Sequence, residues 1–140
     1  MKAVNASAFI RSSIKNGAGD DERIEYSLPA EYCFSDGEAQ IRYRETTEGG
    51  ELITEISVRD GETAVTRRGA VGSRIVFRED KPHSSPYSVG EFSFDMSVTT
   101  KKIRTTLTET GGRLDILYKM TVGGADKEVH FGVRIEVDEK

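Results

Sequence analysis

The feature that most constrains the fold is a two-residue alternation of apolar and polar side chains along almost the whole chain. Near its end, Val129, Phe131 and Val133 alternate with His130 and Gly132. This period places successive side chains on opposite faces of an extended strand, so that one face is apolar and the other is not. No window shows the period of about 3.6 residues that an amphipathic helix requires. The sequence therefore predicts an all-β protein.

Turn signals divide the alternation into about ten segments, which is the rhythm of successive hairpins. They are NGAGDD at 16–21, Asp36-Gly37, Gly49-Gly50, Asp60-Gly61, Gly111-Gly112 and Gly123-Gly124. Pro29 lies inside one segment and predicts a sheet edge or a bulge there. The segment 80–86, DKPHSSP, is the least regular and is predicted to be a loop.

Successive hairpins of this kind form an antiparallel meander, and closing a long meander removes its exposed edges. We therefore predict an up-and-down β-barrel of about 8–10 strands. A flattened β-sandwich is the alternative, because the two architectures look alike in sequence. A chain of 140 residues is the size of one domain, so residues 1–140 are predicted to form a single barrel domain.

Charge and composition narrow the classes of partner. The net charge is −4, and the longest basic runs are the pairs Arg67-Arg68 and Lys101-Lys102. We therefore expect no nucleic-acid partner. No apolar run is long enough for a signal peptide or a membrane-spanning helix, so we expect no membrane association and a cytoplasmic location. Cys33 is the single cysteine and cannot form an intramolecular disulfide, which agrees with that location.

The sequence offers no set of catalytic or metal-binding residues. His83 stands beside Ser84 and Ser85, but the strand–turn–helix context of a serine nucleophile is missing, and a solvated loop histidine is expected. His130 is out of phase with its apolar neighbours and is predicted to face solvent. Two histidines and one cysteine are too few for an ordinary zinc site. We expect no enzymatic activity, no metal and no cofactor.

Three stretches resemble a known family. They are RRGAVGSRIVF at 67–77, SPYSVGEFSFDMSVTTKKI at 85–103 and GGRLDILYKM at 111–120. They are similar to the bacterial YwiB-like family, a domain of unknown function with a lipocalin-like (calycin-type) barrel. The positions that look like its signature are Arg67, Gly69, Ile75, Phe77, Tyr87, Gly90, Thr99 and Ile103. The resemblance implies a lipocalin-like fold and brings no activity with it.

Arg67 is the polar residue of greatest interest. If Val65 faces the interior, the alternation places Arg67 there as well, whereas Arg68 faces outward. A buried guanidinium is costly unless it is paired. Two interpretations stay open, a structural partner such as a carboxylate or backbone carbonyls at the end of the barrel, or an anionic ligand held inside it.

The aromatic residues complete the ligand hypothesis. Those predicted to share the interior are Tyr26, Tyr32, Phe34, Tyr43, Phe77, Phe92, Phe94, Tyr118 and Phe131. A barrel of this size is either filled by its side chains or leaves room for one small ligand. The predicted ligand-binding residues are Arg67, Tyr87, Phe92, Phe94, Met96 and Tyr118. The hypothesis is a barrel that binds a small, partly apolar or anionic molecule. The alternative is a filled barrel that acts as a protein–protein interaction or structural module, including a homodimer.

Overall fold

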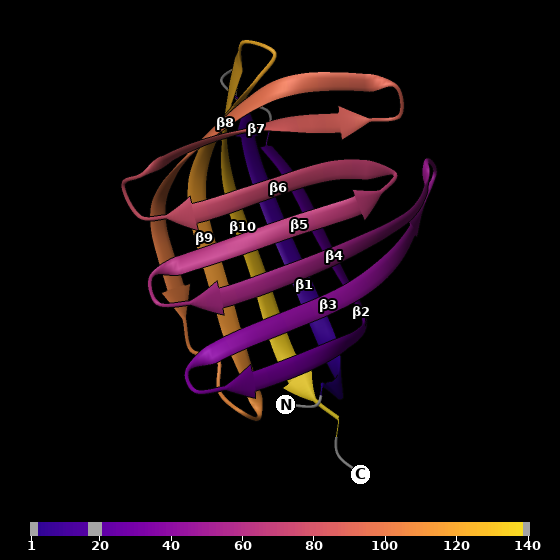
Figure 1. Cartoon of the computed structure of the whole chain (residues 1–140), viewed down its shortest axis with the longest axis vertical. Coiled ribbons are helices and arrows are strands. Elements are labelled where there is room, and N and C mark those ends of the chain that lie inside the picture. The colour runs from indigo at the N-terminus through magenta and orange to yellow at the C-terminus, as the bar shows by residue number, and fades with distance from the viewer. Residues whose placement is uncertain (1–2, 17–20, 139–140) are drawn as a thin grey trace.

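The structure, a computed structural model, describes residues 3–16 and 21–138 and is built from ten antiparallel strands (Figure 1). They are β1 (Val4–Asn16), β2 (Asp21–Ser35), β3 (Glu38–Thr47), β4 (Gly50–Arg59), β5 (Glu62–Gly69), β6 (Val71–Arg78), β7 (Pro82–Val89), β8 (Phe92–Thr105), β9 (Gly111–Val122) and β10 (Ala125–Val137). The predicted turn at 16–21 falls largely outside the described residues. The described part of the chain contains no helix that is long and apolar enough to cross a membrane.

Each strand pairs with its neighbour in sequence, and the first strand also pairs with the last. Ala8 of β1 lies opposite Leu28 of β2 on one side and opposite Ile135 of β10 on the other. The sheet is therefore a closed barrel. In Figure 1, β3 to β6 run across the front, while β1, β9 and β10 run nearly vertically behind them, and β8 crosses the top beside β7 before it bends downward. The up-and-down barrel is confirmed, and the flattened sandwich is not observed.

Alternate residues of each strand fill the barrel. In β4, Leu52, Ile56 and Val58 are buried, while Ile53 and Ser57 between them are only partly covered. Full burial of one large aliphatic side chain contributes roughly 1.5–3 kcal/mol. The large side chains with less than 2 % exposure include Tyr32, Ile41, Ile56, Met96, Leu114, Ile116 and Ile135. These residues come from six different strands, so the core forms only when the barrel closes.

One joint in the wall is short. β6 and β7 pair only at Val71–Val89 and Gly72–Ser88. Beyond these pairs, β7 stays paired with β8, and the His83 Nε2 lies 3.3 Å from the Arg74 carbonyl oxygen of β6. The predicted loop at 80–86 is thus wrong for most of its length, because Pro82–Val89 forms a strand. We call the sparsely paired line between β6 and β7 the seam.

The end of the barrel at which β3–β4, β5–β6, β7–β8 and β9–β10 turn is called the open end below. β2 pairs with β3 only from Ala30 onward, so its first half pairs with β1 alone. Pro29 lies where this one-sided pairing begins, which confirms the sheet edge predicted from it. Likewise β8 extends past β9, since Met96–Val122 is the outermost pair between them.

These extensions correct three predicted interior residues. Phe92 and Phe94 point to the same face as buried Met96, but they lie beyond the last residue of β9 and are 69 % and 44 % exposed. Tyr26, on the extension of β2, is 38 % exposed. The alternation gave the correct face in each case. Neighbouring strands are too short at the open end to cover these rings.

Candidate functional site

A row of polar side chains crosses the interior near the open end. The inward residues Tyr43, Thr54, Arg67 and Ser73 lie on the adjacent strands β3, β4, β5 and β6. They are paired in sequence, Tyr43 with Thr54, Thr54 with Arg67, and Arg67 with Ser73. Antiparallel pairing brings such side chains to about 4.5–5.5 Å between Cβ atoms. Register alone therefore builds a continuous polar band inside the barrel.

Arg67 is the cation of this band and points inward, as the alternation predicts. It is half-buried, and its positive charge lies close enough to the hydroxyl of the buried Tyr43 to affect the pKa of that group. Within residues 3–16 and 21–138, no carboxylate forms an ion pair with Arg67. The next residue, Arg68, faces outward and pairs with Glu55. The structural carboxylate partner that the sequence left open is thus not found in the described residues.

Gly69 fixes the end of the strand that carries Arg67. Its φ of +113° is one that side-chain-bearing residues rarely adopt, and a Cβ there would lie 2.1 Å from the Glu51 carbonyl oxygen. That oxygen accepts a hydrogen bond of 2.9 Å from the Ala70 amide. Only glycine permits this close approach of β4 to the end of β5.

Three tyrosines lie near enough to Arg67 for its charge to affect the pKa of each. Burial raises the pKa of Tyr43 and of Tyr118, and the positive charge of Arg67 opposes both shifts. Partial burial also raises the pKa of Tyr26, whose hydroxyl donates a 3.2 Å hydrogen bond to Glu45 Oε1. All three hydroxyls therefore stay protonated at neutral pH. The site combines the positive charge of Arg67 with neutral hydroxyl groups and with the carboxylate of Glu45, which accepts the hydrogen bond from Tyr26.

The predicted ligand-binding residues divide into two groups. Arg67, Met96 and Tyr118 lie in the interior, and Tyr87 is partly buried against the core. Tyr118 also packs on Phe77, with 4.7 Å between ring centroids. Phe92 and Phe94 lie outside the closed interior, as described above. The structure thus brings four of the six residues inside the wall and leaves two at its rim.

Sequence reasoning missed Tyr26, Tyr43 and Glu45 as site residues. The two tyrosines were predicted to be interior, but nothing in the sequence showed that β3 and β5 place Tyr43 beside Arg67. Glu45 continues the inward phase of Tyr43, and that alternation was the signal available for it.

The two histidines form contacts with residues other than Arg67. His83 is half-buried on β7 rather than solvated in a loop, and its ring contacts the Arg74 carbonyl across the seam. His130 faces outward, as predicted, with its Nε2 3.2 Å from Asp115 Oδ1. Among the residues that the structure describes, no three His, Cys, Asp or Glu side chains are grouped to hold a metal ion. What the site near Arg67 can do chemically is hold an anion by charge-assisted hydrogen bonds.

Comparison with known proteins agrees with the fold. The sequence profile of DUF1934, described as a domain of unknown function, matches residues 9–133. The uncharacterized beta-barrel protein YwiB of Bacillus subtilis (strain 168) is 28 % identical over 118 residues, which cover 84 % of this chain and 83 % of that protein. The crystal structure of the ywiB protein from Bacillus subtilis superposes with a TM-score of 0.90 at 24 % identity, covering 99 % of this chain and 95 % of that one.

Proposed function

Because the chain belongs to the DUF1934 family, whose description assigns no activity, its function has to be argued from the site, and we propose that it binds a small, partly apolar molecule with one anionic end. Arg67 holds the anionic end, and the apolar part lies toward the open end of the barrel. The proposal includes no catalytic step.

The observation that carries this proposal is the contrast between Arg67 and the arginines of the outer surface. Several outward arginines form ion pairs, among them Arg11–Glu25, Arg44–Glu51, Arg59–Glu38, Arg68–Glu55 and Arg78–Glu62. Others, such as Arg42 and Arg74, form none among the described residues but are exposed to water. Arg67 differs from both groups because it faces the interior, beside the neutral hydroxyl of Tyr43. A partly desolvated guanidinium is stabilised most by an anion that accepts several of its hydrogen bonds. A carboxylate or phosphate on a ligand would meet that requirement.

Apolar side chains at the open end supply the rest of the site. Phe92, Phe94, Val89 and Ile24 are between 40 % and 69 % exposed, although each lies on the inward face of its hairpin. Exposed apolar groups around a polar anchor are typical of small-molecule sites. Phe92 and Phe94 thus keep a place in the proposal as rim residues rather than as a cavity lining.

The experiment is calorimetric titration with decanoate, compared with decanol as the uncharged probe. We expect decanoate to bind more tightly than decanol to the wild type. Arg67→Gln should weaken decanoate binding at least tenfold, since a hydrogen bond to a charged group contributes about 1.5–3 kcal/mol. Arg68→Gln is the matched control, because it removes the same charge from the outer face. Equal binding of the two probes, or equal effects of the two variants, would contradict the proposal.

A second candidate function is a homodimer with a filled barrel, and the exposure of Phe92 and Phe94 favours it. In that case the β7–β8 hairpin buries its aromatic face against a second copy. Light scattering after size exclusion decides between the two candidates. If the wild type is a dimer and Phe92→Ser is a monomer, the result favours the homodimer. If the wild type is a monomer at all concentrations, the homodimer is rejected.

A further inference from the structure

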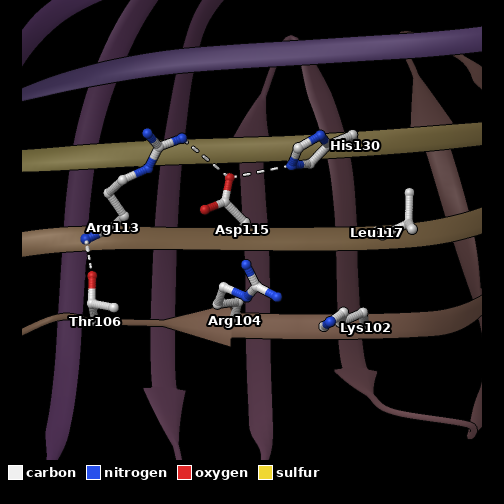
Figure 2. Close-up of a pocket in the computed structure, with 7 residues that line it drawn as sticks. All are labelled: Lys102, Arg104, Thr106, Arg113, Asp115, Leu117 and His130. Carbon is white, nitrogen blue, oxygen red and sulfur yellow. Dashed lines mark hydrogen bonds and ion pairs between the residues drawn. The ribbon is translucent and has the colours of Figure 1, made fainter.

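A second cluster of charged side chains lies outside the barrel, on the outer face of β8, β9 and β10. Figure 2 shows the seven residues that line a groove of about 530 Å³ there. They are Lys102, Arg104, Thr106, Arg113, Asp115, Leu117 and His130. This groove is separated from Arg67 by the wall itself, because the alternate residues Leu114, Ile116 and Tyr118 of β9 are buried on the opposite face.

A bulge in β8 creates the positive half of the groove. Thr100 is buried and pairs with Tyr118, so strict alternation would turn Lys102 inward as well. The register shifts between Thr100 and Lys102, which leaves one extra residue on β8 and reverses its phase. Lys102 and Arg104 therefore face outward, opposite Leu117 and Asp115.

Asp115 contacts two side chains in the other half of the groove. Its Oδ1 lies 3.5 Å from Arg113 Nη2 and 3.2 Å from His130 Nε2 (Figure 2). The carboxylate lies over Gly132, where an added Cβ would be 2.8 Å from the same oxygen. The absence of a side chain at position 132 thus leaves the space that Asp115 occupies.

The charges of the groove do not balance. Lys102 and Arg104 form no ion pair with any carboxylate in the described part of the chain, and Arg113 shares Asp115 with His130. Three permanent cations therefore face one carboxylate, which leaves two positive charges in excess on a chain whose net charge is −4. Similarly placed lysines outside the groove are paired, Lys101 with Glu128 and Lys119 with Asp126.

We propose that this groove binds a small molecule through a phosphate monoester. A phosphate monoester carries a charge of about −1.5 to −2 at neutral pH, which matches the excess, and its three oxygens accept hydrogen bonds from guanidinium and ammonium groups. Leu117 lies opposite Lys102 at one end of the groove and offers an apolar contact to the organic part. The cations line one short groove rather than forming the long track that a nucleic-acid backbone requires. The site is independent of the function proposed for Arg67.

The test is titration of the whole chain with phenyl phosphate, followed by calorimetry or by NMR of the β8–β10 amides. We expect saturable binding that weakens with added salt, as it does for exposed charges. The double variant Lys102→Gln/Arg104→Gln should bind about tenfold more weakly, since each exposed charge contributes modestly. The matched control is Lys101→Gln/Lys119→Gln, which removes two charges outside the groove. It should bind as the wild type does.

Several results would overturn this assignment. An equal loss in the two double variants would mean that the chain attracts phosphate only through its overall charge. Failure of phenyl phosphate to bind the folded wild type at millimolar concentration would reject the site, as would binding that shifts no amide signal of β8–β10. Vesicles of phosphatidylcholine with and without phosphatidate test a lipid source of the same group. Binding to phosphatidate vesicles without binding to phenyl phosphate would replace the small molecule by a membrane surface.

Discussion

Replacing Gly69 by alanine tests whether the close contact at the end of β5 is real. The new Cβ would lie 2.1 Å from the Glu51 carbonyl oxygen, whereas Cβ contacts under 3.0 Å are essentially never seen, so the strands must separate by about 1 Å. A side chain at a φ of +113° adds about 1–2 kcal/mol of backbone strain. Weakening the Ala70–Glu51 hydrogen bond adds about 1 kcal/mol. We expect Gly69→Ala to lower the free energy of unfolding by about 3 kcal/mol.

Gly61→Ala is the matched control for this prediction. Gly61 also has a positive φ, of +63°, but nothing lies within 4 Å of an added Cβ. Only the backbone strain remains, so Gly61→Ala should lower the free energy of unfolding by about 1 kcal/mol. Urea unfolding followed by circular dichroism measures both variants, and equal slopes show that the same surface is exposed. If the two losses agree within about 0.5 kcal/mol, the contact with Glu51 does not constrain this strand end.

Three further predictions concern single positions. Thr63 is fully buried, and its hydroxyl has no hydrogen-bond partner among the described residues. Thr63→Val should therefore raise the free energy of unfolding by about 1 kcal/mol. A lower melting temperature in thermal unfolding would show instead that the hydroxyl forms a hydrogen bond. Burial raises the pKa of Tyr32 from 10.0 to about 12, and its hydroxyl donates to the Thr108 carbonyl. The neutral form is the one stabilised by folding, so the contribution of Tyr32 is complete below pH 10 and is lost as the pH rises toward 12; Tyr32→Phe should remove this part of the pH dependence, together with the step near pH 12 in the tyrosinate absorbance titration. Gly132→Ala should displace the Asp115 carboxylate, since the new Cβ would lie 2.8 Å from Oδ1. Changes in amide and imidazole NMR shifts confined to β9 and β10 would report this displacement. Unchanged His130 signals would contradict the prediction.

The number of strands and their connections could be predicted because the signals are local. Alternation and glycine turns lie within a few residues of each other, and closure follows from the need to cover strand edges. The direction of Arg67 was predictable in the same way, from its phase relative to Val65. What lies beside Arg67 was not, because the register of β3 and β4 against β5 depends on turns whose geometry the sequence does not specify.

The failures have separate physical causes. The segment 80–86 contains Pro82 and Pro86, which lack the amide hydrogen that a strand paired on both sides needs. It forms a strand because β7 faces the seam and is paired along most of its length with β8 alone. Phe92 and Phe94 have the predicted face but extend past β9, a difference in strand length that alternation cannot reveal. The outer groove was not predicted from the sequence, because a bulge reverses the inward–outward alternation of side chains along β8.

The pairing of β1 with β10 has a consequence for how the chain reaches this structure. Every other contact between neighbouring strands joins segments that are close in sequence, but Ala6 must find Val137. Such long-range closure is slow, since chain entropy is lost before the contacts that offset it are made. During synthesis β1 would leave the ribosome with its apolar face exposed and would lack one partner until β10 follows. We therefore expect folding to be limited by this last step, with a transition state in which the hairpins are formed and the barrel is still open.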